Sequence, residues 1–310
     1  MSALEERKIV LMLRETRLDE LVARFNTVLQ AQFYVEHLGA DFGDYLVERQ
    51  TYRAAAAETE AALRQVARVQ RLDRRYLGNF IFGADDLVVV LGQDGLVANT
   101  LKYLDGQPVL GVNPDPARWD GVLLPFGVAD LARLLPEALA LRRPVKHVTM
   151  AKAVLNNGTA LLAVNDLFIG PKSHVSARYR LSALGRQEEQ SSSGIIVSTG
   201  MGSTGWLKSL HAGWTAAAAA FGLEAPVPDG SFALDAPYLQ FFVREPFPSR
   251  TTAASLVTGR VTPAQPLAIT SEMAEHGVIF SDGMEADFLE FNAGTQAVIG
   301  LAEKQGVLLV

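Results

Sequence analysis

The sequence contains no cysteine, and this absence rules out disulfides, thiolate metal sites and cysteine nucleophiles. Charged residues are also sparse, at 20% of the chain against 49% hydrophobic, and the formal net charge is −6. Such a composition can bury a substantial core. A nucleic-acid-binding protein usually carries a basic surplus, so we expect no nucleic-acid partner.

Long apolar runs are missing as well. Charged residues or glycines interrupt every apolar stretch before it reaches the length that crosses a bilayer. The N-terminus carries acidic residues before a short apolar run, whereas a signal peptide begins with basic residues. We therefore expect a soluble, cytoplasmic protein without a membrane partner.

The first half of the chain alternates strand and helix patterns. Continuous apolar runs at Lys8–Leu13, Asp86–Leu91 and Pro108–Asn113 predict buried parallel strands. Helical patterns cover Leu18 to about His37, Tyr45 to about Arg75, Leu96–Leu104 and Val128–Leu141, and the second would end in the cluster Arg68, Arg71, Arg74 and Arg75. This order predicts an α/β domain with a parallel sheet over residues 1–143.

The second half, residues 144–310, is dominated by strand patterns. Ser176–Leu184 alternates apolar and polar residues, which predicts a half-buried antiparallel strand. Further strands are expected at Ala160–Val164, Ile195–Ser198, Leu239–Val243, Leu267–Ser271, Gly277–Phe280, Phe288–Phe291 and Gln296–Leu301, with turns at Asn157–Gly158 and Asp282–Gly283 and one helix at Thr204–Phe221. We expect a β-rich, sandwich-like domain whose last segment is a candidate to pack back on the first domain.

The first candidate for a binding or catalytic motif is LGQDG, Leu91–Gly95, at the end of a predicted buried strand. Ligands of open α/β sheets bind beyond the carboxyl ends of the strands. Glycines there let backbone N–H groups approach phosphate oxygens, and the aspartate could accept a proton from a hydroxyl or help to place a metal. Taken alone, an ordinary tight turn is the preferred interpretation.

Two further motifs lie in the second half. Asn165 and Asp166 close an apolar run, and an amide beside a carboxylate suits the hydroxyls of a ribose, although an Asx turn explains the pair as well. Ser198–Trp206, STGMGSTGW, places hydroxyls and glycines before a helix, which fits either a ligand-binding N-terminus or a capped helix start.

The order and spacing of these motifs resemble the ATP–NAD kinase family. That family has a GGDGT loop, a GVN strand end, an Asn-Glu or Asn-Asp pair and a segment close to STPTGST. The corresponding segments here are Gly92–Leu96, Gly111–Asn113, Asn165–Asp166 and Ser198–Thr204. The mitochondrial-type branch is the most similar, through GVNPDPARWDG, NDLFIG, SSGIIVSTGMGSTGW, FVREP and FLEFNAG. The resemblance runs from about residue 88 to the C-terminus.

The resemblance implies an N-terminal α/β domain and a β-rich C-terminal domain, with the active site in the cleft between them. It implies transfer of a phosphoryl group from ATP, or alternatively polyphosphate, to NAD with Mg²⁺, in a homodimer or higher homo-oligomer. Asp94 would orient or deprotonate the ribose 2′-hydroxyl. The phosphate-binding residues would be Gly92, Gln93 and Gly95, and the NAD-binding residues would be Asn113, Asn165, Asp166, Ser198, Thr199, Met201 and Ser203. No side chain is assigned as a metal ligand.

Three positions depart from the family pattern. Gln93 replaces the second glycine of GGDGT, where a side chain would crowd a phosphate or demand an unfavourable backbone angle. Leu96 and Met201 replace threonines and lose their hydroxyls. These changes keep two alternatives open, a nucleotide-binding homologue with impaired catalysis and a kinase for another hydroxylated acceptor such as a sugar or lipid.

Overall fold

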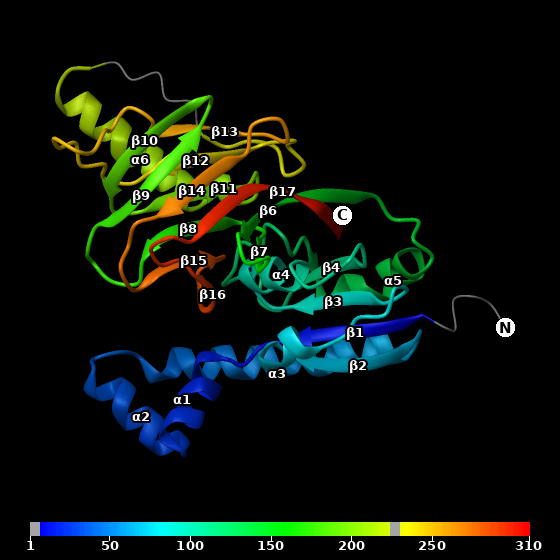
Figure 1. The fold of residues 1–310 in the computed structure, drawn as a ribbon. Coiled ribbons are helices and arrows are strands. Elements are labelled where there is room, and N and C mark those ends of the chain that lie inside the picture. The colour runs from blue at the N-terminus through cyan, green and yellow to red at the C-terminus, as the bar shows by residue number, and fades with distance from the viewer. Residues whose placement is uncertain (1–6, 224–229) are drawn as a thin grey trace. The chain divides into compact units, whose positions relative to one another are not determined.

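The computed structural model describes residues 7–223 and 230–310. The chain divides into two compact units, Met1–Lys146 with Val307–Val310, and His147–Gly306 (Figure 1). The first is an α/β unit and the second is built from antiparallel strands, as the sequence predicts. No helix in the described part of the chain is long and apolar enough to span a bilayer.

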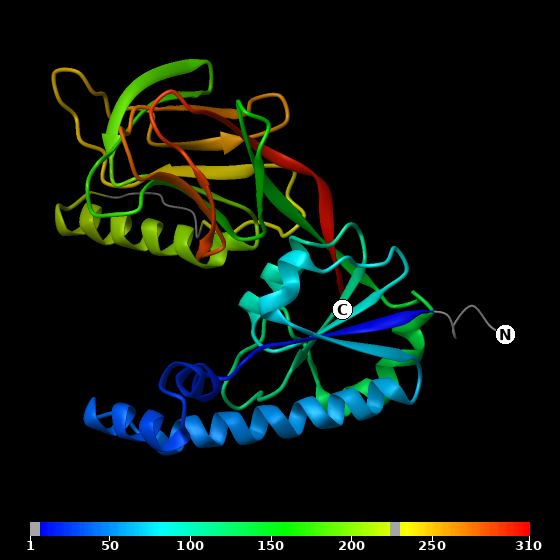
Figure 2. The ribbon, with the colours of Figure 1, turned by 60° about the horizontal axis from the view of Figure 1, so that its bottom comes forward.

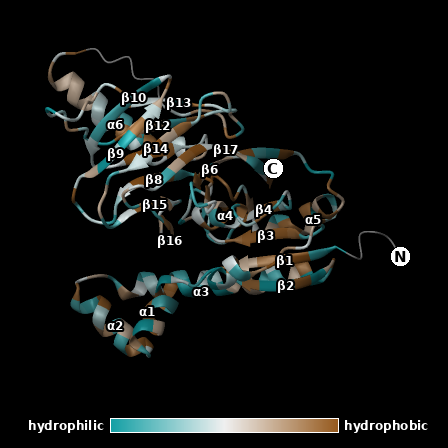
Figure 3. Cartoon of the chain, viewed as in Figure 1, coloured by the Kyte–Doolittle hydropathy of each residue, from teal (hydrophilic) through white to brown (hydrophobic). Residues whose placement is uncertain are grey.

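The first unit has a parallel sheet with the strand order β4-β3-β1-β2. Its strands are β1 (Lys8–Leu13), β2 (Arg68–Asp73), β3 (Leu87–Leu91) and β4 (Pro108–Asn113), and β4 also pairs with β5 (Phe126–Gly127) and with the last residues of β17 (Gln296–Leu309). Every residue of β3 and β4 is buried, which explains why β3 is apolar throughout and why β4 contains no charged residue (Figure 3).

The helices of this unit are α1 (Arg17–Phe25), α2 (Val28–His37), α3 (Phe42–Arg64), α4 (Asp94–Leu101) and α5 (Leu131–Leu139), with short 3₁₀ turns η1 (Arg74–Asn79) and η2 (Val128–Asp130). The long helix α3 runs along the sheet and continues beyond it, where α1 and α2 pack against its first turns (Figure 2). Apolar side chains of α3 and α5 share one core with the parallel strands.

Two helix predictions for this unit are wrong in extent. The expected helix from Leu18 to His37 is broken at Asn26, which adopts φ 66°, and Thr27 caps the next helix. The expected helix to Arg75 ends at Arg64, and Arg68 and Arg71 lie in β2. Leu72 is the one fully buried residue of this edge strand, so its sequence lacks the apolar pattern of a strand. Its arginines and glutamine are good helix formers, which favoured the helix prediction.

The second unit contains two sheets packed face to face. One contains β10 (Arg186–Ser192), β9 (Ala177–Ala183), β14 (Leu267–Ser271) and β17 in that order, with β6 (Val145–Leu155) and β7 (Ala160–Ala163). The other has the order β13 (Thr258–Val261), β12 (Leu239–Val243), β11 (Ile195–Ser198), β8 (Asp166–Pro171), β15 (Gly277–Ser281) and β16 (Met284–Glu290). Their inner faces share one apolar core.

The expected strands of this unit are present, whereas β6, β8, β10 and β13 were not predicted. The Asp282–Gly283 turn has φ values of 53° and 69°, the signature of a type I′ hairpin turn, and it joins β15 to β16. Helix α6 (Trp206–Ala220), preceded by the 3₁₀ turn η3 (Gly202–Thr204), packs on the outer face of the second sheet through His211 and Phe242.

Candidate functional site

Asp94 is the first residue of α4, directly after the loop that follows β3. Its Oδ1 accepts a hydrogen bond from the backbone N–H of Leu123 at 2.7 Å, and its Oδ2 accepts one from Val122 at 3.2 Å. Both carboxylate oxygens are therefore anchored by a neighbouring loop. Each oxygen keeps a further lone pair, so the fixed carboxylate is able to accept a proton or hydrogen bond from a hydroxyl.

The loop residues around Asp94 lie in ordinary backbone conformations. Gln93 has φ −123° and ψ 164°, so the predicted unfavourable backbone angle is not found. Leu96 is buried, and a methyl group added at Gly92 would lie 2.8 Å from its Cδ2 atom. Gly95 is exposed, with open space around it. A side chain at position 92 would therefore displace the end of the Leu96 side chain.

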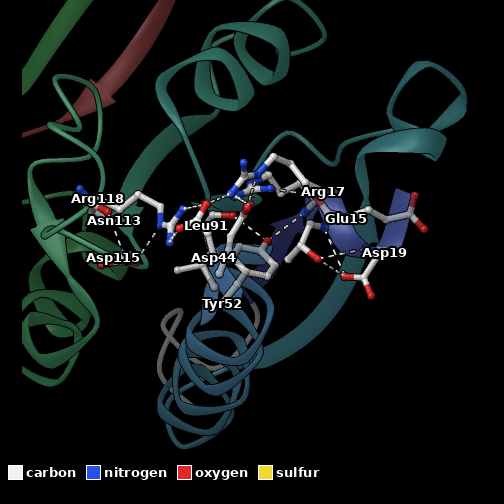
Figure 4. Close-up of polar contacts among 12 residues, drawn as sticks. Glu15, Arg17, Asp19, Asp44, Tyr52, Leu91, Asn113, Asp115 and Arg118 are labelled. Carbon is white, nitrogen blue, oxygen red and sulfur yellow. Dashed lines mark hydrogen bonds and ion pairs between the residues drawn. The ribbon is translucent and has the colours of Figure 1, made fainter. Parts of the chain in front are cut away.

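Tyr52 joins the ends of the two central strands. Its hydroxyl accepts a hydrogen bond from the backbone N–H of Arg14, directly after β1, and donates one to the carbonyl of Leu91 at the end of β3, at 2.9 and 3.0 Å (Figure 4). Burial raises the pKa of Tyr52 to about 12, so the phenol keeps the proton that it donates. Sequence reasoning missed this tyrosine, which lies inside a helical pattern.

A network of ion pairs continues from this point across α3 (Figure 4). Buried Glu48 binds Arg14 at 2.9 Å and Arg17 at 2.5 Å, and Asp44 binds Arg17 and Arg118, each at 2.6 Å. Hydrogen bonds from Arg118 and Arg17 hold the pKa of Asp44 well below its usual range. The network ties the loop after β4 to the first turns of α3.

Asn113, predicted to bind NAD, is buried at the end of β4. Its side-chain amide donates to the carbonyl of Trp119 at 2.8 Å and accepts from the backbone N–H of Asp115 at 3.0 Å. These contacts shape the loop that leads to Val122 and Leu123, the two residues that anchor Asp94. A contact between Asn113 and NAD stays a prediction.

The second unit holds a cavity of about 580 Å³ on the outer face of its second sheet. Three of the predicted NAD-binding residues line it, namely Asn165, Asp166 and Met201. The cavity is of the size and mixed polarity typical of small-molecule sites. Gly202 lies close to Asn165 and Asp166. A methyl group added at Gly202 would be 2.2 Å from the Asn165 carbonyl oxygen, so only glycine fits.

The pKa of the Asp166 carboxyl group, which lines this cavity, is strongly raised. Burial raises its pKa to about 7, and the nearby Asp282 carboxylate adds to the shift, whereas the Ser198 hydroxyl opposes it. Its buried Oδ1 has no hydrogen-bond partner among the described residues. A carboxyl group that is poised between its neutral and charged forms and has an unpaired oxygen is typical of a ligand-binding site.

Asp282 supports this pair, although the sequence suggested only a turn there. Its Oδ1 accepts backbone N–H groups of Val164 at 3.0 Å, Asn165 at 2.7 Å and Asp166 at 3.3 Å. The backbone N–H of Asp282 in turn donates to the Asp166 carbonyl at 2.9 Å. The β15–β16 turn therefore holds the Asn165–Asp166 segment in shape.

A stack of aromatic rings forms one wall of the cavity. Phe168 lies between Trp206 and Phe280, with ring centroids 5.8 and 6.1 Å apart and interplanar angles of 15° and 19°. Two cations line the same cavity, Lys172 and Arg244, and the Arg244 guanidinium lies 5.4 Å from the Trp206 centroid. The alternation of β8 places Phe168 on the outer face, whereas Leu167 and Ile169 belong to the inner core. This strand was not predicted, and the rings next to Phe168 are distant in the chain.

Two of the hydroxyls predicted to line the NAD pocket, those of Thr199 and Ser203, bind backbone carbonyl groups. Ser198, Thr199 and Ser203 are fully buried. The Thr199 hydroxyl donates to the Val164 carbonyl, and the Ser203 hydroxyl donates to the Gly200 carbonyl at 2.6 Å. These side chains shape the Ser198–Thr204 segment, and direct contact with NAD stays a prediction for all three. The described residues contain no group of three acidic or histidine side chains placed to hold a metal ion.

Comparison with known proteins gives matches among solved structures alone. An NAD kinase from Archaeoglobus fulgidus in complex with ATP matches with a TM-score of 0.56 and 17% identity, over 98% of this chain and 93% of that chain. Yeast NADH kinase complexed with NADH matches with a TM-score of 0.57 and 14% identity, over 98% and 83%. No family model matches the chain, and no curated protein matches it. The chain therefore has the two-domain fold of these kinases.

Proposed function

We propose that this chain, which has the fold of NAD kinases, transfers the γ-phosphoryl group of ATP to the ribose 2′-hydroxyl of NAD and forms NADP. The observation that carries the proposal is the anchored carboxylate of Asp94 at the carboxyl end of a central parallel strand. Ligands of open α/β sheets bind at this edge. The neighbours of similar fold are kinases that were crystallised with ATP and with NADH.

The cavity of the second unit supports the choice of a dinucleotide as acceptor. Its aromatic wall of Phe168, Trp206 and Phe280 suits a flat heteroaromatic ring. Asn165 and the Asp166 carboxyl group, which line the cavity, suit the hydroxyls or the amide that such a ring carries with it. Lys172 and Arg244 supply positive charge for the phosphates of the dinucleotide.

In the proposed reaction, the 2′-oxygen forms a bond to the γ-phosphorus while the bond from that phosphorus to the β–γ bridging oxygen breaks, and ADP leaves with the electron pair. Asp94 orients the hydroxyl and accepts its proton, which then passes to solvent. Phosphate oxygens and water supply most ligands of Mg²⁺ in such sites, so the lack of a three-residue metal group among the described residues is compatible with Mg²⁺ that enters with ATP. When bound, Mg²⁺ neutralises charge on the phosphates.

The test is the Asp94→Asn variant, with NADP formation measured by an NADP-specific dehydrogenase. We expect kcat to fall at least 100-fold while the melting temperature changes by a few degrees. Asp130→Asn is the matched control, because Asp130 also accepts a backbone N–H, that of Gly127 at 2.9 Å, but belongs to η2 and not to the GQDG loop. If Asp94→Asn keeps more than a tenth of wild-type kcat, the role of Asp94 is wrong.

Gln93 and Leu96 favour a second candidate, a dinucleotide-binding protein without turnover. Leu96 fills the space over Gly92, and the Gln93 side chain lines a cavity at the same loop, which leaves less room for phosphates than glycine and threonine would. Calorimetric binding of NAD without any NADP formation from NAD, ATP and Mg²⁺ would favour this candidate over the kinase.

A further inference from the structure

The second unit has another cavity, of about 500 Å³, on one side of α6. Every residue of the FVREP motif, Phe242–Pro246, lines it, whereas only Arg244 of this motif lines the cavity that contains Asp166. Helix α6, the yellow-green helix of Figure 2, lies on the outer face of the second sheet and supplies four lining residues from adjacent turns, namely Ser209, Leu210, Gly213 and Trp214. We call this space the α6 cavity, and its volume is typical of small-molecule sites.

The α6 cavity is lined mainly by apolar residues, among them Leu210, Trp214, Phe242 and Val257. Trp214 is 56% exposed, so water covers much of this large ring. A methyl group added at Gly213 would meet no atom within 4 Å, so the helix leaves open space at this point. Contact with an apolar ligand would remove the indole ring from water, and burial of aromatic surface is a main source of binding energy. The walls therefore favour a ligand with an apolar body.

Arg244 supplies the positive charge of the α6 cavity, and its acidic neighbour leaves it free to bind a ligand. The buried Nε of Arg244 has no hydrogen-bond partner among the described residues. Glu245, the acidic residue of the cavity, has a carboxylate oxygen 3.6 Å from a terminal nitrogen of Arg244, which is too long for a hydrogen bond. The Glu245 side chain is 62% exposed, and such an exposed ion pair contributes little. The guanidinium therefore keeps N–H donors for an anionic group of a ligand.

Arg244 also links the α6 cavity to the cavity that contains Asp166, because it lines both. Its guanidinium lies 5.4 Å from the ring centroid of Trp206, at the start of α6, whereas Trp214 lines the α6 cavity about two turns further along the helix. An anion that binds Arg244 from the α6 cavity neutralises the guanidinium and brings like charge near the phosphates of a dinucleotide in the other cavity. A ligand in the α6 cavity should therefore oppose dinucleotide binding.

We infer that the α6 cavity binds a small apolar molecule that carries one carboxylate, with Arg244 as the contact of the carboxylate and with Trp214 and Phe242 against the apolar part. A carboxylate matches the planar guanidinium, which donates two parallel N–H groups to its two oxygens. Medium-chain fatty acids have this chemistry. The site itself is independent of the proposed function, whereas its opposition to NAD rests on that function, which places the phosphates of NAD near Arg244.

The test is calorimetric titration of the full chain with decanoate and, separately, with decylamine, which has the same apolar chain and the opposite charge. We expect decanoate to bind the wild-type protein at least tenfold more tightly than decylamine. Gly213→Leu places a side chain in the open space of the cavity, at a helical position that tolerates leucine, and should weaken decanoate binding at least tenfold. Ala212→Leu is the matched control and should keep the affinity within twofold, because Ala212 is exposed on α6 and does not line the cavity.

Titration with NAD in the presence and absence of saturating decanoate tests the shared role of Arg244. We expect decanoate to weaken NAD binding at least threefold in the wild-type protein and to have no such effect in Gly213→Leu. No decanoate binding, equal affinity for decylamine, or unchanged affinity in folded Gly213→Leu overturns the site. Decanoate binding that leaves NAD affinity unchanged overturns the role of Arg244 in both cavities. Decanoate binding to a protein that does not bind NAD at all contradicts the proposed function and leaves the site intact.

Discussion

At the scale of single residues, the surroundings of Asp166 set the pKa of its carboxyl group. Asp166 follows an apolar run and lies beside Asp282. Its carboxyl group is therefore shielded from water, and its buried Oδ1 has no hydrogen-bond donor among the described residues. Lys172 and Arg244 line the same cavity, yet burial and the like charge dominate and the pKa is raised to about 7. Near neutral pH such a group can donate or accept a hydrogen bond to a ligand.

Replacement of Asp166 by Asn should change how stability depends on pH. Because the folded-state pKa lies above the ordinary value of 3.8, the wild-type protein loses stability from this group as pH rises from about 4 to about 7. The amide does not ionise, so the free energy of unfolding of Asp166→Asn relative to wild type should increase by about 2–4 kcal/mol between pH 4 and pH 8. Urea unfolding at both pH values measures it, and a constant difference between the two proteins contradicts the raised pKa.

Gln93 is the residue at which the sequence departs most visibly from the family pattern. Its backbone angles suit any residue, so a Gln93→Gly variant should keep its stability within about 0.5 kcal/mol, because glycine is tolerated at a helix N-cap. Gln93 lines a cavity of about 280 Å³ at the GQDG loop, so removal of its side chain should lower KM for ATP several-fold. Steady-state kinetics at saturating NAD provide the measurement, and an unchanged KM shows that Gln93 does not crowd the donor.

At the scale of elements, the short β15–β16 hairpin turn holds the segment that contains Asn165 and Asp166. The Asp282 carboxylate accepts three backbone N–H groups of the segment that ends with Asp166, and its φ of 53° suits aspartate or asparagine. One short turn therefore fixes the position of the residues that face the cavity.

Asp282→Ala should destabilise the protein by about 2–4 kcal/mol, because it leaves backbone donors unpaired and places alanine at a positive φ. Asp282→Asn keeps an acceptor and the turn preference, and it should cost about 1 kcal/mol. Asn157→Ala in the β6–β7 turn is the control and should cost less than Asp282→Ala, since the Asn157 side chain accepts hydrogen bonds from Thr159 in its own turn. Equal losses at the two turns in urea unfolding would contradict this role of Asp282.

Elements with a strong local pattern were predictable from the sequence. The buried strands β3 and β4, the alternating strand β9 and the Asp282–Gly283 turn all express one periodicity or one turn preference. The edge strand β2 was not predictable, because it forms by pairing with β1. Arg68 of β2 pairs with Lys8 of β1, which is 60 residues earlier in the chain. For the same reason, Tyr52 and Phe280 gained their roles only from tertiary contacts.

At the scale of the whole molecule, the two proposed substrates belong to different units. The first unit contains Asp94 and the GQDG loop, and the second contains the cavity with Asp166 and the aromatic wall. The sequence motifs lie in both regions, and they could be found because glycines and paired polar residues after buried runs are local signals. The cations and aromatic rings around these motifs come from several elements, so no local sequence pattern could predict that they lie together.

This assignment predicts separable effects on the two Michaelis constants. Phe168→Ala removes the central ring of the aromatic wall and should raise KM for NAD at least tenfold, while KM for ATP changes less than twofold. Exposed Phe33, whose ring stacks on His37 in α2, offers Phe33→Ala as the control with no effect on either constant. A parallel rise of both constants in Phe168→Ala would contradict the assignment of NAD to this cavity.

The most direct test of the central claim is product analysis of the wild-type protein. Incubation with NAD, ATP and Mg²⁺ should yield ADP and a dinucleotide heavier by one phosphate, which an NADP-specific dehydrogenase then reduces because the new phosphate is on the 2′-oxygen. Unaltered NAD after prolonged incubation of the folded protein, with either ATP or polyphosphate as donor, would contradict the claim that this chain is an NAD kinase-like phosphotransferase.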